Sequence, residues 1–308
     1  MVAAASLVSA GVLLAVQQIP TLQKTSFVLA SAGTAVPLGL VGWAVGGGAL
    51  AASLRGRVRE AALASVIGLG LVHASGLSNR FGGRPTAAGR DSLSVVMLNV
   101  EYGQADTAAL MARARAADAD VIVIIEYHPD TEEALGELAP DYPFRVGRPT
   151  RDAEGALVMS RTPLVPRAHV GEVYDNYVVS TRVRGVDWTI AAVHPYPPVT
   201  TATEWVEDSR RVAAMVSAFA DENLVVIGDF NATLDQVTMR DFAALGLTDA
   251  AVATGAGWTT TWPMEYPVWS FAALDHALTS RSVVANRFET FAVAGTDHKG
   301  LAVQVSVR

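Results

Sequence analysis

Residues 26–54 contain no charged side chain, and shorter apolar stretches at residues 2–16 and 61–78 lie on either side of them. A helix needs about 20 predominantly apolar residues to cross the hydrocarbon core of a bilayer. The middle stretch exceeds this length, the third nearly reaches it, and the first falls short. We therefore expect residues 1–78 to form a transmembrane helical anchor with two or three helices.

The first apolar stretch also has the length of the apolar part of a signal peptide. A signal peptide begins with basic residues, which this stretch lacks, and a longer apolar stretch follows it. The pattern therefore favours a retained helix over a cleaved one.

Three arginines, Arg55, Arg57 and Arg59, lie between the second and third apolar stretches. Loops that are rich in lysine and arginine stay on the cytoplasmic side of the membrane. The third helix then leads outward, so we expect a multi-pass protein of the cell membrane with an extracytoplasmic C-terminal domain.

The remainder of the chain is acidic. Four of the 23 basic residues and one of the 30 acidic residues lie in the first 78 positions, so the rest carries a formal charge of −10. Proteins that hold duplex DNA through its phosphates present basic surfaces, and this charge argues against such an enzyme. The chain has no cysteine, which excludes disulfides, thiolate nucleophiles and cysteine-ligated zinc.

After a linker at residues 79–91, residues 92–308 alternate between strand-like and helix-like patterns. The patterns predict strands at residues 94–100, 120–126, 155–160, 177–184, 188–193, 224–227, 274–279, 287–293 and 301–307. They predict helices at residues 105–117, 130–138, 202–220 and 236–245. Early pairs of strand and helix followed by many strands indicate an α/β domain with mixed sheets.

Polar side chains recur where the predicted strands begin or end. Such positions converge at one edge of an α/β fold, and charges there are costly unless they are paired or bound to a metal. The residues are Asn99, Glu101, Glu126, His194, Asp229, Asn231, Asp275, Asp297 and His298.

Six short motifs contain all of these residues except Glu101, which directly follows the first motif: LNV at 98–100, IIE at 124–126, VHP at 193–195, GDFN at 228–231, LDH at 274–276 and TDHKG at 296–300. In this order they resemble the endonuclease/exonuclease/phosphatase superfamily, which includes deoxyribonuclease-like enzymes, sphingomyelinases and inositol-polyphosphate phosphatases. The chain looks like a membrane-anchored bacterial member. The resemblance implies a four-layer α/β sandwich with two mixed β-sheets.

The resemblance also implies a metal site. Glu126 would be the main ligand of a Mg²⁺ or Mn²⁺ ion, and Asn99 would help to hold the metal or the phosphate. Glu101 stands where some members have a second acidic ligand. Asp297 matches the last acid of the family, which binds metal or orients water.

The same resemblance implies catalytic roles. Asp229 and Asn231 would orient the attacking water and contact the phosphoryl oxygens. His298, steered by Asp275, would act as general base or bind the phosphate. His194 would protonate the leaving oxygen, with Glu154 as the acid that pairs with it.

The residue types agree with hydrolysis of a phosphoester, because carboxylate and amide oxygens suit a hard cation and a histidine held by an aspartate can transfer protons. The substrate could be a nucleic acid, a phospholipid head group or a small phosphoester, with the acidic charge and the membrane anchor favouring the last two. The alternative is a non-catalytic domain that binds a phosphorylated ligand. The intact set of polar residues argues against it. No protein partner is expected, and we expect the anchor to contact membrane lipid.

Residues 257–271 are rich in tryptophan and proline. Two readings are open for this segment: a wall that faces the substrate, or a loop that its aromatic side chains pin onto the core.

Overall fold

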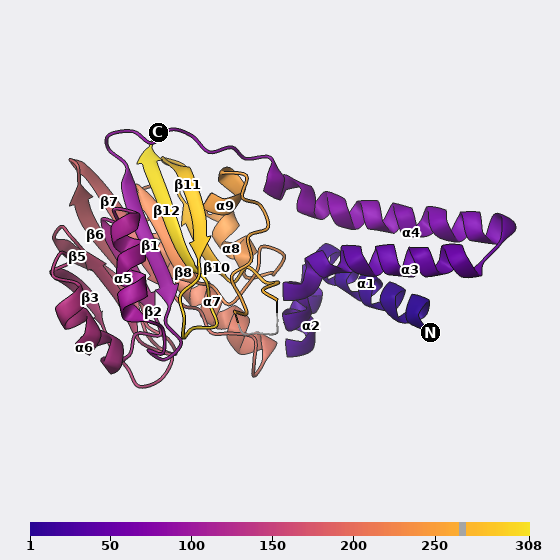
Figure 1. Cartoon of the computed structure of the whole chain (residues 1–308), viewed down its shortest axis with the longest axis horizontal. Coiled ribbons are helices and arrows are strands. Elements are labelled where there is room, and N and C mark those ends of the chain that lie inside the picture. Colours follow the sequence, from indigo (N-terminus) through magenta and orange to yellow (C-terminus); the bar gives the residue numbers. More distant parts are fainter. Residues whose placement is uncertain (265–268) are drawn as a thin grey trace.

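Two six-stranded sheets pack face to face in the part of the chain after residue 92 (Figure 1). The computed structural model describes residues 1–264 and 269–308. Residues 265–268, which belong to the aromatic segment, lie outside the described residues.

The first sheet, sheet A, has the strand order β11–β12–β1–β2–β4–β3. Its strands are β1 (Leu93–Asn99), β2 (Val121–Ile125), β3 (Phe144–Arg148), β4 (Ala156–Ser160), β11 (Val283–Phe291) and β12 (Gly300–Val307). The pair β1–β2 is parallel and its neighbours are antiparallel, so the sheet is mixed, as predicted.

The second sheet, sheet B, has the order β5–β6–β7–β8–β10–β9. Its strands are β5 (Leu164–Val170), β6 (Asn176–Val183), β7 (Val186–Val193), β8 (Leu224–Asp229), β9 (Thr248–Asp249) and β10 (Asp275–Thr279). Only β7 and β8 pair in parallel among its described strands, so this sheet is mixed as well.

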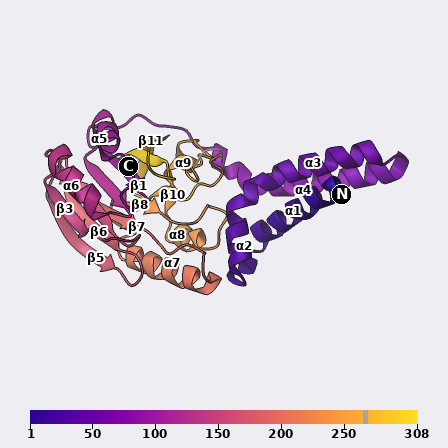
Figure 2. The ribbon, with the colours of Figure 1, turned by 60° about the horizontal axis from the view of Figure 1, so that its bottom comes forward.

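Helices cover the outer faces of both sheets (Figures 1 and 2). The helices α5 (Thr107–Ala116) and α6 (Pro129–Leu138) pack on sheet A, and α7 (Ala202–Ser217) and α8 (Met239–Ala244) pack on sheet B. The short helix α9 (Ala250–Ala253) contributes Ala250 and Ala251 to the core between the sheets. The predicted four-layer sandwich is therefore confirmed.

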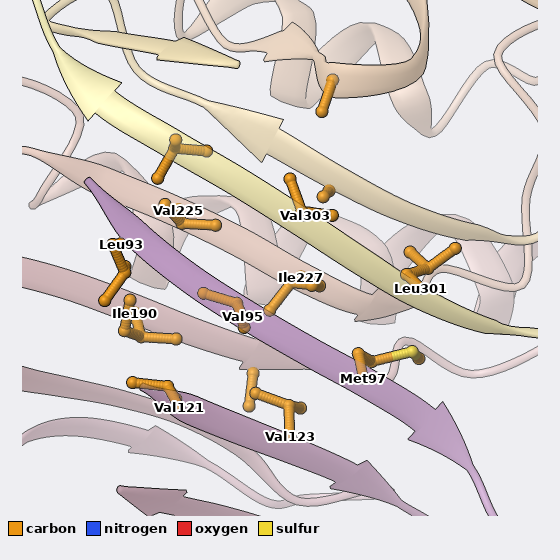
Figure 3. Close-up of a cluster of buried hydrophobic side chains, with 14 of the residues drawn as sticks. Leu93, Val95, Met97, Val121, Val123, Ile190, Val225, Ile227, Leu301 and Val303 are labelled. Carbon is orange, nitrogen blue, oxygen red and sulfur yellow. The ribbon is translucent and has the colours of Figure 1, made fainter. Parts of the chain in front are cut away.

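The alternation of side chains along the central strands builds the two layers of core. Val95 and Met97 of β1 point into the space between the sheets, where they join residues such as Ile227 (Figure 3). Val96 and Leu98 point the other way, under α5 and α6. Both faces of β1 are buried, which explains why its sequence is continuously apolar.

The sequence pattern did not predict strands β3 and β5. Both lie at sheet edges, and all of their residues are exposed or half-buried. β3 carries two arginines and β5 contains Pro166, which are features that protect an edge strand from pairing with other chains. Because burial does not shape these sequences, their hydrophobic pattern is weak.

The N-terminal region forms a helical bundle beside the sandwich (Figures 1 and 2). It consists of α1 (Val2–Gln18), η1 (Pro20–Lys24), α2 (Phe27–Ala32), η2 (Gly33–Leu38), α3 (Gly39–Ser53), α4 (Gly56–Leu77) and η3 (Ser78–Phe81), where η denotes a 3-10 helix. Two helical stretches, Phe27–Ser53 and Gly56–Phe81, have the length and composition needed to cross a membrane, whereas α1 has only 17 residues.

His73 of α4 links three helices of this bundle through hydrogen bonds. It is fully buried, and its Nδ1 accepts a hydrogen bond of 3.1 Å from the Trp43 indole of α3. Its Nε2 lies 2.8 Å from the carbonyl oxygen of Val36 in η2, to which it donates. Both ring nitrogens are thus satisfied, so His73 is a packing residue.

Candidate active site

The ends of β1, β2 and β8 bring three of the predicted side chains together across the two sheets. Asn99 Nδ2 donates hydrogen bonds to Glu126 Oε1 at 3.0 Å and to Asp229 Oδ2 at 3.1 Å. Asn99 and Asp229 are buried, and Glu126 is half-buried. Residues that are far apart in the sequence therefore form one acidic cluster.

The backbone around this cluster adopts conformations that are uncommon for residues with a side chain. Glu101, Tyr102, Glu126 and Asn231 have φ values between 46° and 57°. Left-handed backbone outside glycine often accompanies functional sites, because the surrounding structure must hold it in place. At Glu126 this turn directs the carboxylate so that Oε2 accepts from the Tyr102 amide at 3.1 Å.

Asp229 lies between two histidines. Its Oδ2 is 3.7 Å from Nε2 of His194 and 3.7 Å from Nε2 of His298, and its Oδ1 accepts from the Asn231 amide at 2.8 Å. The Asn231 side chain is oriented by a bond of 3.1 Å to the Pro195 carbonyl. Burial raises the pKa of Asp229 above the ordinary value, and the two imidazoles oppose that rise.

His298 pairs with Asp275, which stands opposite Asp229 in the β8–β10 register. His298 Nδ1 lies 2.9 Å from Asp275 Oδ2, and Thr296 Oγ1 accepts from the His298 amide. Burial works against the charged imidazole, but Asp275 and Asp229 outweigh it and raise the pKa of His298 to about 10. Next to these carboxylates, His298 is therefore a cation at neutral pH.

His194 has the opposite electrostatic character. Burial lowers the pKa of its imidazole to about 4, so the ring is neutral at neutral pH. Asn176 Oδ1 accepts from the His194 amide at 2.7 Å, and the Tyr174 ring stacks on the imidazole with centroids 4.4 Å apart. These two residues fix the position of the ring.

Glu154 is half-buried, but no hydrogen bond joins its side chain to His194 in the described part of the chain. The Glu154 carbonyl instead accepts from the Asp175 amide at 2.8 Å. The carbonyl of Ala153 approaches the His194 ring without the geometry of a hydrogen bond. The pairing of Glu154 with His194 stays a prediction.

Glu101 and Asp297 lie next to each other at the rim of the cluster. Glu101 Oε2 accepts from the Asp297 amide at 2.7 Å, and Asp297 Oδ1 is 3.7 Å from His298 Nε2. Asp297 Oδ2 accepts from the Trp262 indole at 2.8 Å. All ten predicted site residues except Glu154 are thus joined by these contacts.

Two arrangements of side chains could hold a metal ion. Glu126 lies among oxygen donors, and burial raises its pKa to about 7, a cost that a bound cation would offset. Asp229, Asp275 and His298 offer ligand atoms within 4.8 Å of one another, and Asp275 Oδ1 is buried without a hydrogen-bond partner. The acidic and imidazole donors around these residues fit a divalent cation.

Tyr174 and Asn176 were not predicted from the sequence as site residues, and Trp262 was predicted only as part of the aromatic segment at residues 257–271. Thr296, which bonds the Asn99 carbonyl at 2.8 Å, was part of a motif but had no role. The polar tripeptide Tyr174 to Asn176, at the start of β6, is the only local pattern that marks this part of the site. The aromatic segment also touches the site, since Trp262 binds Asp297, whereas Trp269 is 88% exposed.

Comparison with solved structures identifies the same fold in several proteins. An endonuclease/exonuclease/phosphatase from Beutenbergia cavernae shares 20% identity with a TM-score of 0.54, covering 71% of this chain and 72% of that chain. TDP2 from D. rerio, complexed with single-strand DNA product, shares 15% with a TM-score of 0.55, covering 70% and 99%. A mannosyl-6-phosphatase from Bacteroides thetaiotaomicron shares 15% with a TM-score of 0.54, also covering 70% and 99%. No curated protein matches the sequence.

The sequence model of the Endonuclease/Exonuclease/phosphatase family matches residues 98–298. This span contains every residue of the acidic cluster and both flanking histidines. The two mixed sheets match the fold of the solved structures compared above. The chain therefore belongs to the endonuclease/exonuclease/phosphatase family.

Proposed function

We propose that this protein is a metal-dependent hydrolase of phosphoester bonds. One arrangement carries the proposal: Asn99 bridges Glu126 and Asp229, while the His298–Asp275 pair lies against the same Asp229 carboxylate. Phosphoryl transfer requires stabilisation of spread negative charge, a positioned nucleophile and proton transfer. An acidic cation site beside two histidines can meet these requirements.

Glu126 would hold Mg²⁺ or Mn²⁺, with Asn99, Glu101 and Asp297 as further oxygen donors. Such an ion supplies neutralisation of the charge on the phosphoryl oxygens. A placement among Asp229, Asp275 and His298 is less favourable for a hard cation, because the 2.9 Å bond between His298 and Asp275 already occupies an atom of each residue.

The other site residues would orient the water, accept its proton and bind the phosphate. Asp229 would orient the attacking water and accept its proton, and Asn231 would contact a phosphoryl oxygen. His298, with its pKa raised to about 10 by its carboxylate neighbours, suits phosphate binding better than the role of general base.

His194 would protonate the leaving oxygen. Its pKa of about 4 means that it must first gain a proton, and an approaching phosphate anion would favour that step. Glu154 would support the resulting imidazolium from the side of Nδ1, which has no hydrogen-bond partner among the described residues.

The anchor would place this site outside the cytoplasm. Arg55, Arg57 and Arg59 lie in and just after the turn between α3 and α4, at the end of the bundle that is far from the sheets (Figure 1). The positive-inside rule assigns that turn to the cytoplasm. Together with the acidic charge of residues 79–308, a membrane position favours phospholipid head groups or small phosphoesters over duplex nucleic acid.

The test is hydrolysis by the full chain in lipid nanodiscs, with Mg²⁺ and then with a chelator. The panel comprises bis(p-nitrophenyl) phosphate, phospholipid vesicles, single-stranded DNA and a sugar phosphate. We expect chelator-sensitive turnover of at least one of the phosphoesters. Saturable binding of these phosphates with no turnover under any metal would instead support the non-catalytic alternative.

A further inference from the structure

We propose that the N-terminal region is a structural part of the active site, and that Gln23 is a positioning residue for Asp229 and Asn231. Two segments meet here. The docking segment comprises residues 20–38 (η1, α2 and η2), and the site loop comprises residues 232–237, which directly follow Asn231. The inference rests on the proposed function only where turnover is measured.

Gln23 is the centre of the contact. Its side chain is fully buried, and its amide group both donates hydrogen bonds to the loop and accepts them from it. Nε2 donates to the Asp235 carbonyl at 3.0 Å and to the Val16 carbonyl at 3.2 Å, while Oε1 accepts from the Val237 amide at 2.8 Å. One glutamine side chain thus satisfies a backbone carbonyl and a backbone amide of the loop, as a neighbouring β-strand would, and so holds the loop backbone in place.

A second buried glutamine makes the reciprocal contact from the loop. Gln236 Nε2 donates to the Ala30 carbonyl of α2 at 2.9 Å, and its Oε1 accepts from the Thr233 amide at 2.7 Å. The approach depends on Gly33, because a Cβ at that position would lie 2.5 Å from Gln236 Cγ. The two glutamines thus clamp the loop against the docking segment.

Packing and charge reinforce the contact. Ala30 is part of the same apolar core as Phe230, the residue between Asp229 and Asn231. Arg80, from the end of the bundle, pairs with Asp235 at 2.6 Å, and both side chains are buried. A membrane tether alone would need none of these interactions.

The other side of the site loop is held by the sheet. His276 Nε2 lies 2.9 Å from the Ala232 carbonyl, and its Nδ1 lies 2.8 Å from Asp249 Oδ2. His276 follows Asp275 in β10. The site loop therefore lies between the docking segment and the strand that carries Asp275, and it is hydrogen-bonded to both. Loss of the Gln23 contacts would leave buried backbone groups of the loop without partners and release one of its two supports.

The experiment compares the full-length protein in nanodiscs with the variants Gln23→Ala and Gln236→Ala. The matched control is Gln18→Ala, because Gln18 is exposed and its side chain bonds only to Gln17 among the described residues. Two quantities are measured: hydrogen exchange of the peptide that covers residues 229–238, and steady-state kinetics on bis(p-nitrophenyl) phosphate.

We expect faster exchange in residues 229–238 for Gln23→Ala and Gln236→Ala, together with a fall in kcat of about 10-fold to 100-fold and little change in KM, since small misplacements of reacting groups have effects of this size. Gln18→Ala should match the wild type in both measurements. Gln23→Asn, which keeps an amide on a shorter side chain, should recover part of the lost rate.

Unchanged exchange in residues 229–238 would overturn the docking, and faster exchange with an unchanged kcat would overturn the positioning role. Absence of turnover in the wild type would count against the proposed function alone, because the exchange measurement still reports the contact.

Discussion

Asn99 of sheet A donates a hydrogen bond of 3.1 Å to Asp229 of sheet B, and this bond joins the two sheets at the acidic cluster. The same Nδ2 also binds Glu126, so one amide separates two carboxylates. Without that amide the two negative charges would face each other in a poorly solvated place. The site is therefore built to hold positive charge.

The substitution Asn99→Asp tests this relationship. It puts a third carboxylate between Glu126 and Asp229, so we expect the metal-free protein to lose about 1–3 kcal/mol of stability, the usual cost of an unsatisfied buried polar group. Added Mg²⁺ should stabilise this variant more than it stabilises the wild type. Thermal unfolding with Mg²⁺ and with chelator measures both effects, and equal metal-induced shifts would count against a cation beside Asn99.

We expect the free energy of unfolding of the metal-free protein to depend on pH through Glu126. Burial raises its pKa in the folded protein to about 7, above the ordinary value of 4.5. Between pH 4.5 and 7, Glu126 is ionised in the unfolded chain but keeps its proton in the folded protein. The free energy of unfolding therefore falls as pH rises through this range, by about 3 kcal/mol in total. Denaturant unfolding in chelator should show the decline in the wild type but not in Glu126→Gln.

The same group links metal binding to pH. The cation requires the ionised carboxylate, so apparent Mg²⁺ affinity should weaken by about tenfold for each pH unit below 7. Calorimetric titration at pH 6 and pH 7.5 measures the change. An affinity that does not vary over this range would remove Glu126 from the proposed ligand set.

Asp275 should control the charge of His298. The carboxylates of Asp275 and Asp229 raise the pKa of His298 to about 10, and Asp275→Asn removes the nearer one, so that pKa should fall. Stability from this pair is fully present below pH 6.5 and is lost as pH rises towards 10. NMR titration of the imidazole follows the pKa. Asp187→Asn, at an exposed ion pair with Arg182, is the control and should leave the titration unchanged.

The role of His194 can be separated from that of His298 by varying the leaving group. If His194 protonates the leaving oxygen, His194→Gln should lower kcat by about 10²–10⁴-fold for an alkyl phosphoester. It should have a much smaller effect for p-nitrophenyl esters, whose leaving group departs without a proton. Equal losses on both substrates would show that His194 does not act as the general acid.

Much of this fold could be read from the sequence where both faces of a strand are buried. The apolar runs of β1, β2 and β8 are of this kind, and the polar residues that follow them predicted the acidic cluster. The edge strands β3 and β5 lack that pattern because solvent covers much of their surface.

Residues that act through tertiary contacts were harder to find. Tyr174 stacks on His194 only because the segment before β6 lies beside the end of β7, and no local pattern encodes that neighbourhood. Gln23 is similar: it lies in a region whose composition indicates a membrane anchor, yet its partners are in the site loop. Gln23 lies in the polar stretch at residues 17–25, between the first two apolar stretches, and nothing in that stretch distinguishes it from its neighbours.

The central claim is that the residues from both sheets form one metal-dependent hydrolytic site around Asp229. The most direct test measures phosphoester turnover by the wild type, by Asp229→Asn and by Asp221→Asn, an exposed aspartate that serves as control. Each protein is assayed with Mg²⁺, after chelation, and after Mg²⁺ is restored. We predict reversible, metal-dependent turnover in the wild type and in Asp221→Asn, and a loss of at least about 10²-fold in Asp229→Asn. Near-normal turnover by Asp229→Asn, or wild-type turnover that persists in chelator, would contradict the account.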